Sequence, residues 1–120
     1  MKKLGILLLS MAAFSASAVE KLALDLNLYL NNKLVKSQVI QAETDKVHTV
    51  VAEKILKFSV TPTLNGDVVT LTSTMYKFED GLYTKFQEPR LETKLNLKAT
   101  IEVGAENIQL YKVEVVAKKI

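Results

Sequence analysis

The sequence predicts an all-β fold: a small antiparallel two-sheet sandwich of the immunoglobulin-like type, with a small β-barrel as the alternative. Three observations support this prediction. Apolar and polar residues alternate in many short segments, which is typical of strands that bury one face. Turn-forming residues separate these segments at intervals of roughly eight to twelve residues, as in sandwiches and small barrels. No crossover helix is indicated between the segments, so we expect neighbouring strands to be antiparallel.

The clearest alternation covers residues 22–30. Every second position there is a leucine, and Asp25, Asn27 and Tyr29 lie between leucines. A helix would scatter these leucines around its axis, whereas a strand points them all to one side. We therefore expect a strand whose leucine face belongs to the core. The opposite face, with Asp25, Asn27 and Tyr29, is the candidate binding face, because exposed tyrosines are typical anchors of protein interfaces.

The same two-residue period recurs along the chain and predicts nine strands. Residues 44–54 have a competing helical interpretation, in which Thr44 caps the helix. Val47, Val50 and Val51 are β-branched and favour a strand there. The predicted strands lie at residues 22–30, 34–42, 46–52, 55–61, 68–76, 82–88, 91–93, 97–103 and 108–117.

Turn-forming residues mark the ends of several of these strands. Asn31-Asn32 tolerates the positive φ of a tight hairpin, and Asn65-Gly66-Asp67 and Glu79-Asp80-Gly81 are further hairpin signals. Pro62 and Pro89 lack the backbone N–H that a ladder uses. We therefore expect both prolines at a sheet edge or at the end of a strand.

The first 18 residues have the pattern of a signal peptide. Lys2 and Lys3 precede an apolar run of about ten residues, and Ala16 and Ala18 follow with the small-x-small spacing that a signal peptidase accepts. The apolar run is too short to cross a bilayer of roughly 30 Å as a helix. We expect cleavage of residues 1–18 on export to a bacterial periplasm or the extracellular space. One all-β domain, residues 19–120, then remains without a transmembrane segment.

Charge and cysteine content exclude several classes of function. The chain has 16 Lys and Arg residues against 13 Asp and Glu residues, and loss of Lys2 and Lys3 leaves 14 against 13. The basic footprint of a nucleic-acid-binding protein is therefore missing. The chain has no cysteine. Disulfides, thiol catalysis and thiolate metal sites are therefore excluded.

No set of residues indicates catalysis, a cofactor or a metal site. His48 is the only histidine, and no nucleophile-elbow sequence surrounds any serine, so a hydrolase triad is not indicated. One histidine without cysteine does not make a persuasive zinc site. Carboxylates such as Asp25, Glu92 and Glu102 fall on polar strand faces, and no spacing selects a catalytic pair. The glycines are isolated, so no phosphate-binding loop is indicated.

These observations predict a protein that is not an enzyme. The first hypothesis is an exported accessory protein that binds another envelope protein through a sheet face or an edge strand. The alternative is a small periplasmic inhibitor or immunity protein that blocks an exported hydrolase. That function requires a projecting loop, and residues 63–68 and 76–83 are the candidates.

Overall fold

The computed structural model describes residues 20–104 and 109–120. The predicted signal peptide at residues 1–18, with Ala16 and Ala18 at its cleavage site, lies outside the described residues and stays a prediction. The same holds for residue 108, the first residue of the last predicted strand.

The described residues form nine strands, one for each strand predicted from the two-residue period. Residues 44–54 contain a strand and no helix, so the strand interpretation of this segment is confirmed. The strands are β1 (Lys21–Leu30), β2 (Lys33–Glu43), β3 (His48–Ala52), β4 (Leu56–Asn65), β5 (Val68–Glu79), β6 (Leu82–Gln87), β7 (Arg90–Lys94), β8 (Lys98–Gly104) and β9 (Leu110–Lys119).

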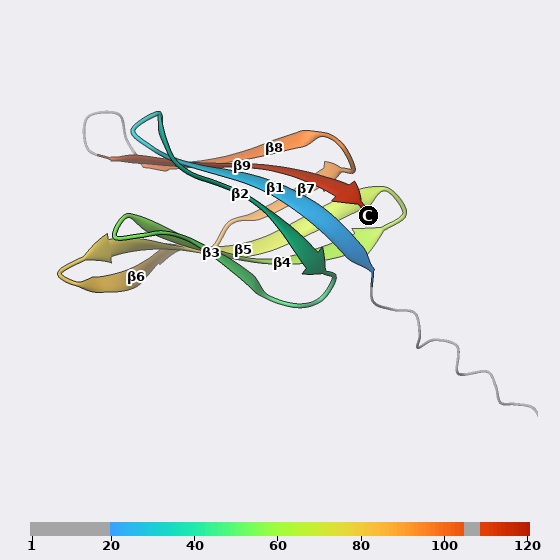
Figure 1. Cartoon of the computed structure of the whole chain (residues 1–120), viewed down its shortest axis with the longest axis horizontal. Coiled ribbons are helices and arrows are strands. Elements are labelled where there is room, and N and C mark those ends of the chain that lie inside the picture. The colour runs from blue at the N-terminus through green and yellow to red at the C-terminus, as the bar shows by residue number, and fades with distance from the viewer. Residues whose placement is uncertain (1–19, 105–108) are drawn as a thin grey trace, which may run out of the picture.

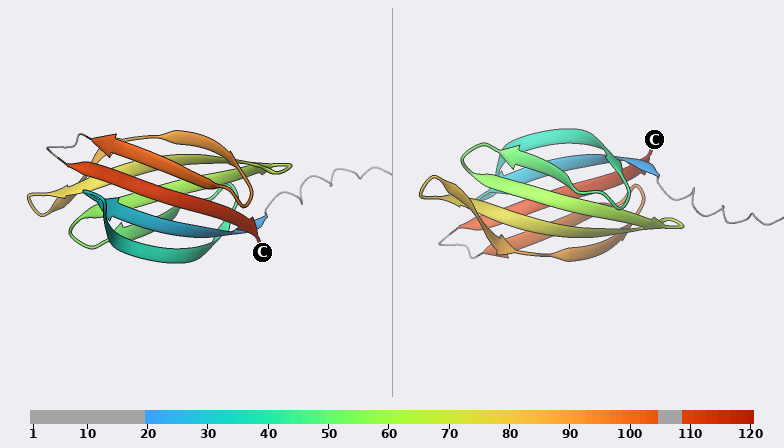
Figure 2. Two further views of the ribbon diagram at one scale, coloured as in Figure 1. Left: turned by 90° about the horizontal axis from the view of Figure 1, so that it is seen from above. Right: turned by 90° about the horizontal axis from the view of Figure 1, so that it is seen from below.

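The strands form two antiparallel sheets that pack face to face (Figure 1). The first sheet has the order β2-β1-β9-β8, and the second has the order β3-β4-β5-β6, with β7 also paired to β5. Figure 2 shows the outer face of each sheet in turn. The predicted all-β, sandwich-like architecture of two antiparallel sheets is therefore confirmed.

Strands β6 and β7 share one side of β5 because a proline separates them. β6 pairs with the last residues of β5 and β7 with its first residues. Between them, the Pro89 carbonyl accepts a hydrogen bond from the Ser73 N–H at 3.0 Å and another from the Ser73 hydroxyl at 2.8 Å. Pro89 lies at a strand end, as predicted. Its carbonyl accepts hydrogen bonds from both polar donors of the buried Ser73.

Strands that follow one another within a sheet pair with each other, except for β6 and β7, which both pair with β5. The chain changes sheet only between β2 and β3 and between β7 and β8, and the first and last strands, β1 and β9, pair with each other. Immunoglobulin domains instead have Greek-key connections. The immunoglobulin-like connectivity is therefore not confirmed. The alternative of a closed barrel is not supported either, because no ladder joins the sheets at these two crossings.

The core lies between the sheets and contains the predicted leucine face. Leu22, Leu24, Leu26 and Leu28 are fully buried, and Leu30 is half-buried. Opposing side chains from the second sheet complete the core, and the largest of these is Phe58. Burial of the first four leucines stabilises the fold by on the order of 8 kcal/mol before chain entropy is subtracted.

The three predicted hairpin turns are confirmed by their backbone angles. Asn31 and Asn32 have φ values of 52° and 65°, and Asp80 and Gly81 have φ values of 52° and 79°. Two successive residues with positive φ are what a two-residue type I′ hairpin requires. Gly66 adopts φ 67° in the turn between β4 and β5.

Candidate functional site

The predicted binding face is the outer surface of β1. Asp25, Asn27 and Tyr29 are half-buried there, on the side opposite the leucines. The Tyr29 hydroxyl donates a 3.0 Å hydrogen bond to Glu114 Oε1 in β9, and Lys112 Nζ lies 4.5 Å from the centre of the Tyr29 ring. Asn27 Oδ1 accepts a 2.7 Å bond from Ser37 Oγ. Asn27 and Tyr29 are therefore engaged with neighbouring strands of their own sheet.

Glu114 interacts with three side chains of this outer face, which are Tyr29, Lys98 and Lys112. The hydrogen bond from Tyr29 is the main cause that lowers the pKa of the Glu114 carboxyl, and the nearby Lys98 and Lys112 lower it further. Lys98 Nζ lies 3.5 Å from Glu114 Oε2. The same hydrogen bond is the main cause that raises the pKa of Tyr29. The predicted face is thus a cross-strand polar network, an arrangement that stabilises a sheet.

The hydrogen bonds of β1 determine which backbone groups of β2 point toward β1 and which point away from it. The Asn31 N–H donates to the Leu110 carbonyl at 2.7 Å, in register with the β1–β9 pairing. Antiparallel ladders alternate, so the odd-numbered residues of β1 bond to β9 and the even-numbered residues bond to β2. The β2 partners of those even-numbered residues are Ala42, Ile40, Gln38 and Lys36. The backbone N–H and C=O groups of Ser37, Val39 and Gln41 therefore point to the free edge.

Two hydrogen bonds at the end of β2 agree with this alternation. The Thr44 N–H donates to the Glu20 carbonyl, toward β1, and the Glu43 N–H donates to His48 Nε2 at 3.0 Å, away from β1. His48 therefore has a structural role, because its ring nitrogen accepts a hydrogen bond from the Glu43 N–H at the edge of the sheet. Within residues 20–104 and 109–120, no comparable partner serves the outward N–H groups of Ser37, Val39 and Gln41.

The β2 edge is also the least protected edge of the sandwich. Residues 37–42 contain no charge, proline or glycine, and Val39 and Leu34 are 63% and 51% exposed. A β-bulge opposite Leu28 and Tyr29 distorts only the start of β2, near Lys33 and Lys36. By contrast, β8 carries Lys98 and Glu102, β3 has five residues, and Pro89 interrupts the edge formed by β6 and β7. Charges, short length and proline are features that discourage strand addition.

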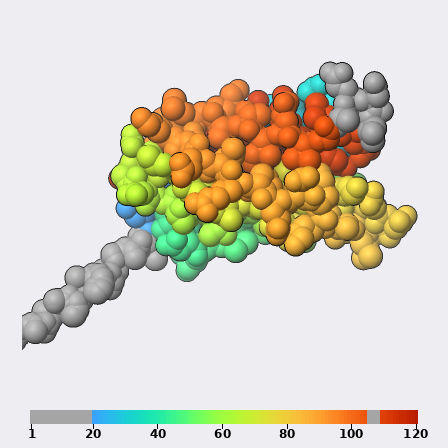
Figure 3. Space-filling view, turned by 180° about the vertical axis from the view of Figure 1, so that it is seen from behind, coloured from blue at the N-terminus to red at the C-terminus, as the bar shows by residue number. Residues whose placement is uncertain are grey.

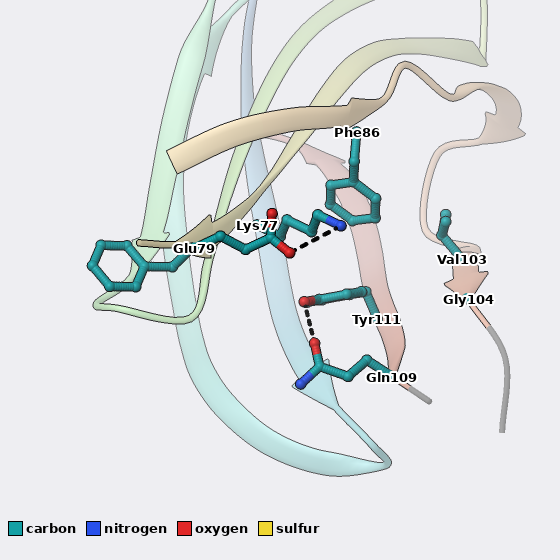
Figure 4. A pocket seen from close by; sticks show the side chains of 8 residues that line it. Lys77, Glu79, Phe86, Val103, Gly104, Gln109 and Tyr111 are labelled. Carbon is teal, nitrogen blue, oxygen red and sulfur yellow. Dashed lines mark hydrogen bonds and ion pairs between the residues drawn. The ribbon is translucent and has the colours of Figure 1, made fainter. Parts of the chain in front are cut away.

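A pocket of about 540 Å³ lies between the sheets at the end that contains the β5–β6 hairpin (Figure 4). Phe86 and Tyr111 both line the pocket and pack against each other, with ring centres 4.9 Å apart and ring planes tilted by 53°. Lys77 Nζ pairs with Glu79 Oε2 at 3.3 Å on one side, and the Tyr111 hydroxyl donates to Gln109 Oε1 on the other. The pocket therefore combines an aromatic floor with polar walls.

Sequence reasoning missed this pocket, although β5 contains a signal for it. The inward-facing positions of β5 are Val69, Leu71, Ser73 and Met75, followed by Lys77 and Glu79, as their pairing with β4 and β6 shows. A charged side chain is costly to bury. Lys77 and Glu79 therefore mark the part of β5 where the two sheets do not pack directly against each other.

The two loops suggested for an inhibitor lie at opposite ends of the sandwich. The turn between β4 and β5, around Gly66, is at the end where β1 begins, and the β5–β6 hairpin is at the other end (Figure 2). Leu82 is 69% exposed at the tip of the β5–β6 hairpin. The two loops therefore do not form a single surface.

In the part of the chain that the structure describes, no group of three or more His, Asp or Glu side chains is placed to hold a metal ion. The described residues also contain no helix long and apolar enough to cross a membrane. No family model, no curated protein and no solved structure matches the chain.

Proposed function

We propose that the protein is a non-enzymatic binding protein of the cell envelope that pairs its β2 edge with an extended segment of another exported protein. The observation that carries this proposal is the row of outward backbone groups at Ser37, Val39 and Gln41. An unpaired edge of this kind accepts a further strand through main-chain hydrogen bonds. Export itself rests on the signal-peptide pattern at residues 1–18.

The side chains along β2 suggest the composition of the partner segment. Val39 and Leu34 are exposed beside the free edge, so apolar residues at alternate positions of the partner gain contacts there. Lys33 and Lys36 lie toward the start of β2. An acidic residue in the partner next to these lysines would complement their charge and fix the direction of the added strand.

The experiment is quantitative capture from envelope extract of the native organism with a matched pair of proline variants. Val39→Pro removes an outward N–H without breaking the β1–β2 ladder, because proline is tolerated where the N–H faces away from the sheet. Thr100→Pro makes the equivalent change on β8, because the Asn31–Leu110 bond also directs the N–H of Thr100 away from β9. Val39→Thr changes the side chain and keeps the N–H.

We expect one protein to be recovered with the wild type, Thr100→Pro and Val39→Thr, and to be lost with Val39→Pro. All variants must show the unfolding midpoint and circular dichroism spectrum of a folded sheet. Equal recovery with Val39→Pro would rule out strand addition at β2.

A blocking function is the second candidate, and the exposed Leu82 at the tip of the β5–β6 hairpin favours it. A hairpin that projects an apolar side chain can enter the active-site cleft of a hydrolase. Leu82→Asp, added to the same capture experiment, separates the two functions. Loss of the partner with Leu82→Asp and its retention with Val39→Pro would support the blocking function.

A further inference from the structure

We propose that the pocket between the sheets binds a short neutral saccharide, which contacts Phe86 and hydrogen-bonds to Lys77 and Glu79. This site is separate from the β2 edge, since its residues come from β5, β6, β8 and β9 and from Gln109, which directly precedes β9. The inference therefore does not depend on the proposed strand addition.

The pocket exists because the inward row of β5 becomes charged. Lys77 and Glu79 follow the buried Met75 in that row, and the Lys77 side chain is still 34% exposed. The two sheets diverge at this end (Figure 1), and the β5–β6 hairpin projects from the molecule there (Figure 3). A volume of about 540 Å³ lies within the range of small-ligand sites, roughly 300 to 1,000 Å³.

The charges of the pocket favour a neutral ligand. Lys77 and Glu79 already neutralise each other at 3.3 Å. An anionic ligand that binds Lys77 would also lie close to the Glu79 carboxylate, which repels it, and a cationic ligand that binds Glu79 would lie close to the Lys77 ammonium. A neutral ligand leaves the ion pair intact, so it avoids leaving one charge without its partner.

The hydrogen-bonding groups favour a ligand with hydroxyls. The Lys77 ammonium only donates, the Glu79 carboxylate only accepts, and the Gln109 amide does both. A purely apolar ligand would take these groups out of water without replacing their hydrogen bonds, which is costly. Hydroxyl groups donate and accept, so a polyhydroxylated molecule satisfies all three side chains.

The aromatic floor supplies the remaining feature of a sugar site. The Phe86 ring turns a face toward the pocket, since Lys77 Nζ lies over it at 5.8 Å from the ring centre. The C–H groups on one side of a pyranose ring form an apolar face that packs on an aromatic ring. Tyr111, which is almost fully buried against Phe86, holds this ring in place.

A second hollow next to Phe86 leaves room for a second sugar unit. It has a volume of about 300 Å³, and Phe86 lines both it and the pocket. Its walls repeat the same chemistry, with Lys85 paired to Glu88 at 3.2 Å and with Gln87 beside them. Two polar hollows that share one aromatic residue, each with an internal ion pair, fit two linked neutral sugars better than a single one.

The test is a titration of the ¹⁵N-labelled protein followed by amide chemical shifts. The probes are glucose, N-acetylglucosamine, maltose and cellobiose, with hexanoate as an anionic comparison. We expect at least one of the disaccharides to give saturable shifts at Lys77, Phe86 and Tyr111, with affinity above that of its monosaccharide. Absence of saturable shifts with all four sugars, or tighter binding of hexanoate, would overturn the proposal. Equal affinity for mono- and disaccharides would overturn the occupancy by two units.

Variants on the two faces of the second sheet provide the control. Lys77→Met removes the donor in the pocket, and we expect it to weaken sugar binding at least about tenfold, which corresponds to 1.4 kcal/mol. Lys57→Met removes a similar lysine on the outer face, where Lys57 Nζ lies 4.3 Å from the centre of the Tyr76 ring. Binding should be unchanged by Lys57→Met. Glu79→Gln keeps a hydrogen-bonding group and tests the site independently if Lys77→Met fails to fold. Equal weakening by Lys57→Met and Lys77→Met would contradict the assignment.

Discussion

At the scale of single residues, the contact between Tyr29 and Glu114 makes the outer face of the first sheet sensitive to acid. The 3.0 Å hydrogen bond from Tyr29 is the largest of the causes that lower the pKa of Glu114. A carboxyl whose pKa is lower in the folded than in the unfolded chain stabilises the fold fully above its unfolded pKa. That contribution is lost as the pH falls through the folded pKa.

The first prediction is that Tyr29→Phe raises the pKa of Glu114 toward its ordinary value. Lys98→Gln should raise it less, because the charge of Lys98 is a smaller cause of the shift. A ¹³C titration of side-chain carboxyls measures both values. Urea unfolding should show Tyr29→Phe less stable than wild type at neutral pH, and this part of the difference should disappear in acid. A larger pKa change with Lys98→Gln would contradict the assigned cause.

At the scale of elements, the leucines of β1 assign its inner face to the core. Leu26 is fully buried in the middle of this face. The second prediction is that Leu26→Asp unfolds the domain, because burying an unpaired carboxylate costs several kcal/mol out of a total stability of about 5 to 15 kcal/mol. Circular dichroism and urea unfolding provide the measurement.

The control for Leu26→Asp is the same change on an exposed strand position. Thr72 lies on the outer face of β5 opposite Arg90. Thr72→Asp should change the free energy of unfolding by less than about 0.5 kcal/mol, as is usual for surface substitutions. A stably folded Leu26→Asp variant would mean that the leucine face of β1 is not the core.

The sequence predicted the elements well because each signal was local. The alternation around Leu26 needs only neighbouring residues, and the Asn31-Asn32 turn needs only its own backbone angles. The connectivity was harder to predict, because nothing near Leu22 in the sequence indicates that it pairs with Lys119. Many arrangements of two sheets bury the same alternating faces, so the pattern selects a sandwich and leaves its strand order open.

The candidate sites were predicted less well than the strands, because they depend on which strands become edges and where the sheets separate. Val39 looks like any other alternating residue until β2 is known to lie at the edge of its sheet. The pocket residues Lys77 and Glu79 could not be predicted for a similar reason. Their inward direction follows only from the register of β5 with β4 and β6. Tyr29 was correctly placed opposite the leucines, yet its hydrogen bond to Glu114 comes from a strand distant in sequence.

At the scale of the whole molecule, the first and last strands are neighbours in the first sheet, so the two ends of the described chain lie close together. β1 and β9 pair side by side, with Leu22 opposite Lys119, and Lys119 Nζ lies 4.0 Å from Glu20 Oε1. Both ends of the described chain therefore lie at the same end of the sandwich (Figure 2). A short linker can therefore join these two ends at one end of the first sheet.

The third prediction concerns a circular permutant of residues 20–120. A short glycine-serine linker joins Ile120 to Glu20, and the chain is opened between Asn65 and Gly66, in an exposed turn. We expect a folded protein that keeps the β1–β9 amide contacts in nuclear Overhauser spectra. Its folding should differ in rate, because the β1–β9 pairing becomes local while the β4–β5 pairing becomes distant in sequence.

A second permutant, opened between Ser73 and Thr74, is the control because it cuts the middle of β5, the strand that pairs with three others. We expect this permutant to lose cooperative unfolding. Each half of β5 would have to pair with its neighbours without the covalent connection to the other half, which raises the entropic cost of folding. Both permutants carry the same linker, so a difference between them reports only the position of the opening. If the permutant opened at Asn65 also failed to fold, the β4–β5 hairpin would be required for assembly, and the covalent link between β1 and β9 would not compensate for its loss.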